Sequence, residues 1–186
     1  MTRQIEAPAS GPTFELPAVE AQVRPWRLDD GPSLVRHADS RRVWLNLRDS
    51  FPHPYTPAAA ARWLEWAAAR RPPTHVAIAG GGAAVGGIGF APQEDVLRRS
   101  AEIGFWLGEA YWGRGIATAA LVAVSAHALA SGDLCRLYAC VFDGNGASMR
   151  VLEKAGYVRE GCLRKSAVKD GRTVDQHLWA LVREDR

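Results

Sequence analysis

Apolar and polar positions alternate along residues 101–107, where every second side chain is apolar, and this period predicts a strand with one buried face. A glycine-punctuated turn follows at residues 112–118, and from Ile116 onward apolar residues recur at the spacing of a helix. Free N–H groups at a helix start bind anions, and the first turn here carries no Asp or Glu that would repel one. The three elements therefore indicate a phosphate site, although a structural turn whose glycines only allow close packing would have the same sequence.

The remaining segments alternate between strands and helices. Further strands are expected at residues 23–28, 75–79, 85–90, 134–142, 157–161 and 174–182. Further helices are expected after residues 29–30, at residues 57–70 behind the N-cap Thr56, and at residues 147–155. The glycine cluster at residues 80–83 predicts a hairpin turn and not a phosphate loop, because no helix follows it. This interleaving predicts an α/β fold with a mixed sheet.

Length and composition indicate the domain organisation. The chain has 186 residues, of which 47% are hydrophobic and 23% are charged, and this is ordinary for one globular domain with a sizeable core. Residues 1–20 contain several prolines among Ala, Ser and Gly, so we expect a loose N-terminal lead-in there. One domain is then expected over residues 21–186.

The net charge and the cysteines limit the kinds of binding partner to be expected. The net charge of +3 mildly favours anionic ligands, but no run of basic residues forms a stripe, so we expect no direct nucleic-acid partner. The cysteines show no spacing typical of zinc, so we expect no metal site and a reducing, cytoplasmic location. No apolar stretch reaches the roughly 18 residues of a membrane helix and no signal peptide is evident, so no membrane partner is expected.

A second motif spans residues 145–157, where Asn145 precedes a short helix, Ser148 lies in its first turn and Gly156 ends it. Taken locally, this pattern describes a capped helix and no more. Together with residues 101–118, it resembles the acyl-CoA-binding signature of the GCN5-related N-acetyltransferase (GNAT) superfamily. The similarity extends over about residues 23–183. It is closest to the branch that acetylates N-terminal Ser or Ala of ribosomal proteins, for which residues 48–56, 101–107 and 160–163 are typical.

The resemblance implies a single GNAT-like domain with a mostly antiparallel sheet of six to seven strands, splayed at the acyl-CoA slot, and helices on both faces. It also implies acetyl-CoA as the co-substrate, with the pyrophosphate on the amides of the turn and the pantetheine between the strands at residues 101–107 and 134–142. An exposed N–H near Leu107 would polarise the thioester carbonyl. Trp112 stands where the superfamily often has Gln or Arg, but Arg114 still supplies a positive charge. The residues expected to bind the co-substrate are Trp106, Leu107, Trp112, Gly113, Arg114, Gly115, Ile116, Ala117, Thr118, Asn145 and Ser148.

The resemblance further implies that a primary amine attacks the thioester directly in a ternary complex, without a covalent enzyme intermediate. Glu102, which shares its strand face with Gly104, is one candidate for the general base. Glu160 is the other, because it resembles the base proposed for the serine-acetylating members. Ser148 resembles their general acid, with Tyr157 as a weaker substitute. For both glutamates an ordinary solvated or ion-paired role stays open.

The acceptor is the open part of the prediction. By the same resemblance Phe51, His53 and Tyr55 line its opening, although a proline-fixed loop whose aromatic rings pack on the core would have the same sequence. We expect a protein or peptide N-terminal amine as acceptor, and a monomer or homodimer. The alternatives are a small-molecule amine (an aminoglycoside, a polyamine or an amino-acid-like toxin) and a non-catalytic acyl-CoA-binding module. Only Asp49 and Glu65 are acidic within residues 41–71, which argues against a polycation.

Overall fold

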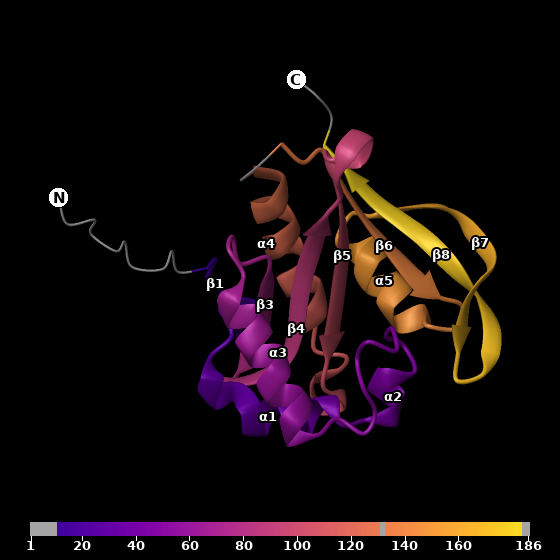
Figure 1. Ribbon diagram of the computed structural model, residues 1–186. Coiled ribbons are helices and arrows are strands. Elements are labelled where there is room, and N and C mark those ends of the chain that lie inside the picture. The colour runs from indigo at the N-terminus through magenta and orange to yellow at the C-terminus, as the bar shows by residue number, and fades with distance from the viewer. Residues whose placement is uncertain (1–10, 131–132, 184–186) are drawn as a thin grey trace.

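The computed structural model describes residues 11–130 and 133–183, which build one open sheet with helices on both faces (Figure 1). The sheet has eight strands in the order β1-β2-β3-β4-β5-β6-β8-β7. The strands are β1 (Phe14–Leu16), β2 (Ala21–Arg24), β3 (His75–Gly80), β4 (Ala83–Pro92), β5 (Ser100–Leu107), β6 (Arg136–Phe142), β7 (Val158–Lys169) and β8 (Arg172–Val182). Neighbours are antiparallel except β5 and β6, which run parallel. The expected mixed, mostly antiparallel sheet is thus confirmed.

Helices cover both faces of this sheet, as expected. They are α1 (Gly31–Ala38), α2 (Arg41–Trp44), α3 (Pro57–Ala69), α4 (Ile116–Ala130) and α5 (Gly146–Lys154), with 3-10 helices at Pro17–Val19, Leu28–Asp30, Asp95–Leu97 and Glu109–Tyr111. None of the helices within residues 11–130 and 133–183 is long and apolar enough to cross a membrane.

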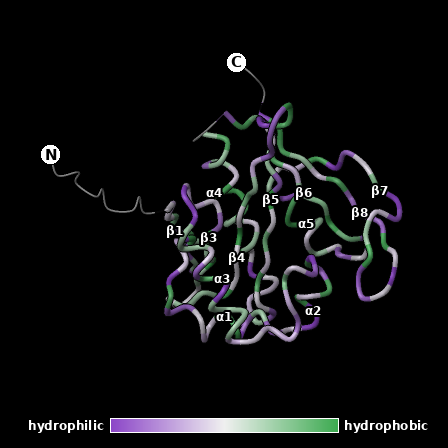
Figure 2. Tube along the Cα trace, in the orientation of Figure 1, coloured by the Kyte–Doolittle hydropathy of each residue, from purple (hydrophilic) through white to green (hydrophobic). Residues whose placement is uncertain are grey.

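Two apolar cores lie between the sheet and the helices, one on each face of the sheet. Successive side chains of a strand point to opposite faces, so Val76 and Ile78 pack in the core under α4 while Ala77 packs in the core under α1 and α3. Figure 2 shows apolar residues along much of the central strands, whereas hydrophilic residues are frequent in the hairpin of β7 and β8. Alternate residues of one strand thus contribute to different cores, each covered by its own helices.

The start of α3 is encoded locally. The Thr56 hydroxyl oxygen accepts the N–H of Ala59 at 3.2 Å, and Pro57 occupies the first helical position, where an N–H would have no helical partner. The glycine cluster between β3 and β4 forms a hairpin turn, as predicted. Both local predictions are confirmed.

The sheet is larger than the six to seven strands expected from the sequence. Phe14 and Leu16 pair with β2 and pack against the core under α4, so the expected loose lead-in contains a strand. Three residues are too few to show a period, and Pro12 and Pro17 flank them. Residues 1–10 of that lead-in lie outside the described residues. β7 is also longer than expected, because it pairs with β8 as far as Lys169.

Candidate active site

The parallel pair of β5 and β6 is short, and a cavity opens where it ends. The strands pair only between Ser100–Glu102 and Arg136–Tyr138, whereas β5 stays paired with β4 as far as Leu107. A cavity of about 590 Å³, which we call the first cavity, lies between the end of β5 and the start of α5. The expected splay of the sheet is therefore present.

Backbone groups of β5 face this gap. Gly108, directly after β5, donates its N–H to the Val85 carbonyl of β4 at 2.8 Å. The backbone N–H and C=O groups of successive residues point to opposite edges of a strand. Those of Phe105 and Leu107 therefore point away from β4, toward the side where β6 no longer pairs. The Leu107 carbonyl there accepts the indole N–H of Trp112 at 2.7 Å. The N–H groups of this edge are oriented to bind a ligand that extends along β5.

The turn after β5 requires its two glycines. Gly113 and Gly115 have φ angles of +76° and +78°, a left-handed conformation that residues with a Cβ rarely adopt. α4 then begins at Ile116, and its first turn contains no acidic residue. The turn residues that line the first cavity are Trp112, Gly113, Gly115, Ile116, Ala117 and Thr118. The unpaired N–H groups of this helix start therefore adjoin the cavity and are suited to an anion.

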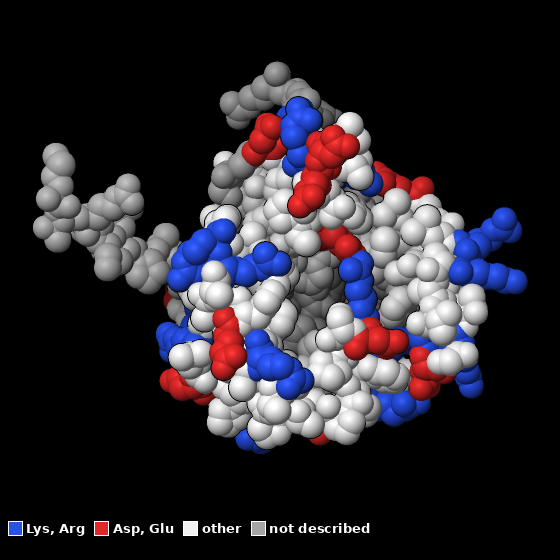
Figure 3. All heavy atoms as spheres, in the orientation of Figure 1, with Lys and Arg blue, Asp and Glu red and all other residues white. Residues whose placement is uncertain are grey.

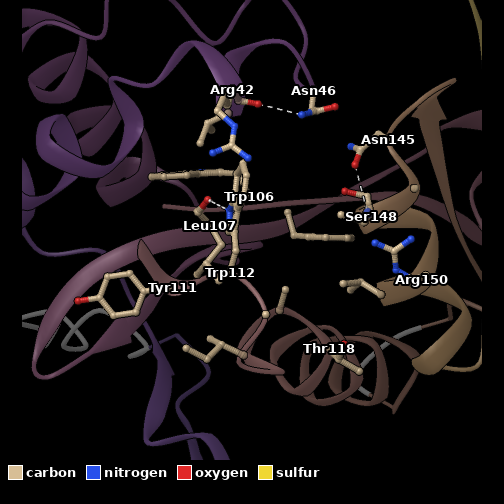
Figure 4. A pocket seen from close by; sticks show the side chains of 18 of the residues that line it. Arg42, Asn46, Trp106, Leu107, Tyr111, Trp112, Thr118, Asn145, Ser148 and Arg150 are labelled. Atoms are coloured by element: carbon tan, nitrogen blue, oxygen red, sulfur yellow. Dashed lines mark hydrogen bonds between the residues drawn. The ribbon is translucent and has the colours of Figure 1, made fainter. Parts of the chain in front are cut away.

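The opposite wall of the first cavity is the start of α5. The Asn145 side-chain oxygen accepts the Ser148 N–H at 3.1 Å, which caps the helix. Figure 4 shows Asn145, Ser148 and Arg150 on this side of the cavity and Arg42 across from them, with Asn46 between Arg42 and Asn145. The two motifs that the sequence analysis joined by resemblance thus line one cavity.

The first cavity is lined by cations and by no acid. Among the described residues around it, the charged side chains are Arg42, Arg150 and Lys154. Arg42 also lies over the Trp112 ring, 4.9 Å from its centroid. Its guanidinium is also paired with the Glu109 carboxylate at 2.5 Å, so Arg150 and Lys154 are the lining cations with no ion pair among the described residues.

Arg42, Arg150 and Lys154 were not among the residues expected from the sequence. Arg150 and Lys154 are four residues apart on α5 and share one helix face, a spacing that is visible in the sequence. Arg42 reaches the cavity only through tertiary folding. Arg114, expected among the binding residues, does not belong to the lining, and its guanidinium lies over the Tyr111 ring at 5.2 Å.

A second cavity, of about 320 Å³, adjoins the first. The residues that line both are Asn46, Leu47, Phe105, Trp106, Asn145 and Ser148. On the face that α1 and α3 cover, Figure 3 shows a hollow in which most atoms belong to neither acidic nor basic residues. Residues 41–51, which we call the 41–51 segment, supply a wall of both cavities. The site is therefore a pair of connected cavities that meet at Trp106 and Ser148.

Two of the three aromatic residues expected at the acceptor opening line the second cavity. Phe51 lies 4.8 Å from Tyr55 and 5.4 Å from Trp106 between ring centroids. Burial raises the pKa of Tyr55 to about 12. His53 lines neither cavity: its ring stacks on Trp44 at 5.7 Å. Within the proline-fixed loop, Phe51 and Tyr55 therefore face the second cavity while His53 packs elsewhere, a difference that the sequence does not show.

The structure places the two candidate glutamates differently. Glu102 lines the second cavity and pairs with Arg48, a residue that the sequence analysis did not single out. Glu160 lies on β7 outside the lining of both cavities, and hydrogen bonds from Arg136 lower its pKa. Tyr157 is buried and shares a 2.8 Å hydrogen bond with Ser125, also outside both linings. Of these three groups, only Glu102 lines either of the two cavities described.

His75 lies in the lining of the second cavity and is partly buried beside Trp63 and Trp66. Burial, with a smaller effect of Arg70, lowers its pKa to about 4, below the usual value of 6.5. As pH falls through 6.5 the unfolded chain takes up this proton before the folded chain does, so folding stability is lost until about pH 4.

Urea unfolding at pH 7 and pH 5 measures this loss. Because the ring is partly exposed, we expect His75 to account for only about 1 to 2 kcal/mol of it. The His75→Phe variant should lose that part of the pH dependence, whereas His53→Gln should retain it. If the free energy of unfolding changed equally between pH 7 and pH 5 in the wild type and in both variants, His75 would not be the group responsible.

No group of three or more His, Cys, Asp or Glu within the described ranges could hold a metal ion.

The family model of the acetyltransferase (GNAT) domain matches residues 21–158. The chain is similar to the ribosomal-protein-serine acetyltransferase of Escherichia coli (strain K12), with 35% identity over 98 residues that cover 53% of this chain and 54% of that protein. It is 39% identical to the probable N-acetyltransferase YjcK of Bacillus subtilis (strain 168) over 101 residues, 53% of this chain and 56% of that protein.

The chain thus spans about half the length of the curated relatives it matches. A solved structure similar over more of its length is Mycobacterium smegmatis RimJ in complex with CoA-disulfide. Its TM-score is 0.81 at 27% identity, and the match covers 94% of this chain and 88% of that chain.

Proposed function

This chain belongs to the acetyltransferase (GNAT) family, and we propose that it transfers an acetyl group from acetyl-CoA to a primary amine. One observation carries the proposal. In the described sheet, the edge of β5 at Phe105 and Leu107 has no partner on β6, and the gap there starts at a helix N-terminus without acidic residues and leads to Ser148. A cofactor with a pyrophosphate at one end and an amide-bearing arm at the other matches those features in order.

The first cavity would hold the donor. Its pyrophosphate would accept hydrogen bonds from the amides of residues 113–118, with Arg42, Arg150 and Lys154 nearby as cations. The pantetheine amides would pair with the edge of β5 at Phe105 and at the N–H of Leu107, since the Leu107 carbonyl already accepts the Trp112 indole N–H. CoA in the similar RimJ structure supports this choice of ligand.

The second cavity would hold the acceptor amine. Glu102 would take the proton of the amine, directly or through water, as the amine nitrogen attacks the thioester carbonyl. The free N–H near Leu107 would stabilise the developing oxyanion. As the C–S bond breaks, the Ser148 hydroxyl would donate a proton to the leaving thiolate and regain one from solvent. Because the cavities meet at Ser148, both substrates would be bound at once and no acyl-enzyme would form.

We further propose a peptide or protein N-terminal amine as the acceptor. The ribosomal-protein-serine acetyltransferase among the relatives supports this class. The acceptor cavity also argues against a polycation, since Arg48 already pairs with Glu102, the one acidic residue among the described lining. An α-amino group with a pKa near 8 needs little help to lose its proton.

A thiol-release assay tests the function across N-terminal peptides, a polyamine and an aminoglycoside. We expect acetyl transfer to peptides, and Ser148→Ala should lower kcat by about tenfold to 100-fold with acetyl-CoA affinity nearly unchanged, because it removes only the proton donor. An unaffected rate would remove Ser148 as the acid. Transfer to the polyamine or aminoglycoside alone would replace the peptide acceptor, and CoA binding without transfer to any amine would favour a non-catalytic module.

A further inference from the structure

Three glycines of β4 and β5 lie close together in the lining of the second cavity. Gly89 on β4 lies directly opposite Gly104 on β5, and the next pair on the same face begins with Gly87. Glycine inside a strand weakens it, so a cluster of glycines there indicates a requirement for space. Each of these glycines lines the cavity.

Two of these glycines are explained by packing within the protein. A Cβ at Gly87 would lie 2.8 Å from the indole nitrogen of Trp106, and a Cβ at Gly89 would lie 2.4 Å from the ring of His75. These two positions therefore let aromatic rings lie close to the strand.

Gly104 is different, because a Cβ there would have no heavy atom within 4 Å. Its side-chain direction faces open space between Glu102 and Trp106, its neighbours on the same face of β5. Each of these neighbours is about 7 Å away along the strand, which leaves the width of a ring above the glycine. No packing contact in the described protein requires glycine at this position.

The cavity that contains this space has several aromatic side chains in its lining. Phe51, Tyr55, Trp63, His75 and Trp106 all line the cavity. His75 is neutral at pH 7, because burial lowers its pKa to about 4. Among the described lining residues, the full charges are those of Arg48 and Glu102, which pair with each other. Such a space favours burial of an apolar or aromatic group and gives little to a charged one.

We propose that the space above Gly104 is a specificity pocket for a large apolar or aromatic side chain on the residue that carries the acceptor amine. The proposal rests on the proposed function, since it places that amine where the two cavities meet. The side chain of an N-terminal Ser or Ala would leave the aromatic walls uncovered. An N-terminal Phe, Trp or Leu fills the pocket, with its amine directed toward Ser148 and Glu102.

Binding of two tripeptide amides, Phe-Gly-Gly and Ser-Gly-Gly, to the CoA-loaded protein tests the pocket by calorimetry. We expect the Phe peptide to bind about tenfold more tightly than the Ser peptide, because a phenyl ring is removed from water. Gly104→Val fills the open space with a residue suited to strands and should reduce this preference to about twofold or less. Gly161→Val is the matched control, since a Cβ there also meets no atom within 4 Å and lies outside both linings.

The wild-type comparison is decisive even where a variant fails to fold. Equal affinity for the two peptides, or an unchanged preference in folded Gly104→Val, would overturn the pocket. Acetyl transfer to the same two peptides is measured separately, with acetyl-CoA in place of CoA. A binding preference without transfer supports the pocket and contradicts the proposed function, whereas equal binding with transfer to both peptides overturns the pocket and leaves the function standing.

Discussion

Gly115→Glu is expected to weaken CoA binding by about 100-fold or more. The substitution places a carboxylate at the helix start that would receive the pyrophosphate, where the first turn of α4 carries no acid. It also imposes a φ angle of +78° on a residue with a Cβ, which costs about 1 to 2 kcal/mol of folding stability. The charge repulsion and the distorted turn act in the same direction on affinity.

Isothermal titration with CoA measures the effect, and Gly115→Ala separates its two causes. Alanine has the same backbone strain without the charge, so it should weaken binding by less than about tenfold. Thermal unfolding of both variants shows whether the fold is retained. An unchanged Kd in folded Gly115→Glu would contradict the phosphate-binding turn.

Glu102→Gln is expected to lower kcat by about 100-fold while the KM for acetyl-CoA changes little. The amide keeps the shape of the side chain but takes up no proton from the amine. Loss of the ion pair with Arg48 should have little effect on stability, because the Arg48 side chain is 68% exposed.

Glu160→Gln is the matched control for that experiment. Glu160 lies outside both cavity linings, so its removal should leave kcat within about twofold of the wild type. The reverse pattern, a large loss in Glu160→Gln and none in Glu102→Gln, would assign the base to Glu160 and would require the acceptor to approach from β7.

The parts of the site that the sequence predicts are those encoded locally. The strand period, the left-handed glycines of the turn and the Asn145 cap each depend on residues within a few positions of one another. The two cap-and-turn motifs could be joined only through the family resemblance, because no local rule states that residues 112–118 and 145–148 meet.

The parts that the sequence does not predict depend on contacts between distant segments. Arg48 and Glu102 are 54 positions apart, and neither residue type alone indicates a pair. Phe51 and His53 both belong to the same loop, yet only Phe51 faces the second cavity, because packing on Trp44 takes the histidine away. The strand β1 could not be predicted for a related reason. It is stabilised by pairing with β2, and its three residues alone give no strand pattern.

The 41–51 segment has a consequence for how the two substrates affect each other. Arg42 and Asn46 border the first cavity, while Arg48 and Phe51 border the second, so a single stretch of backbone contacts both binding spaces. If ordering of this stretch by one substrate changes the affinity for the other, thermodynamic linkage requires the change to be mutual and equal in free energy. In that case the acceptor affinities measured with and without CoA differ, and their ratio measures the coupling between the two cavities.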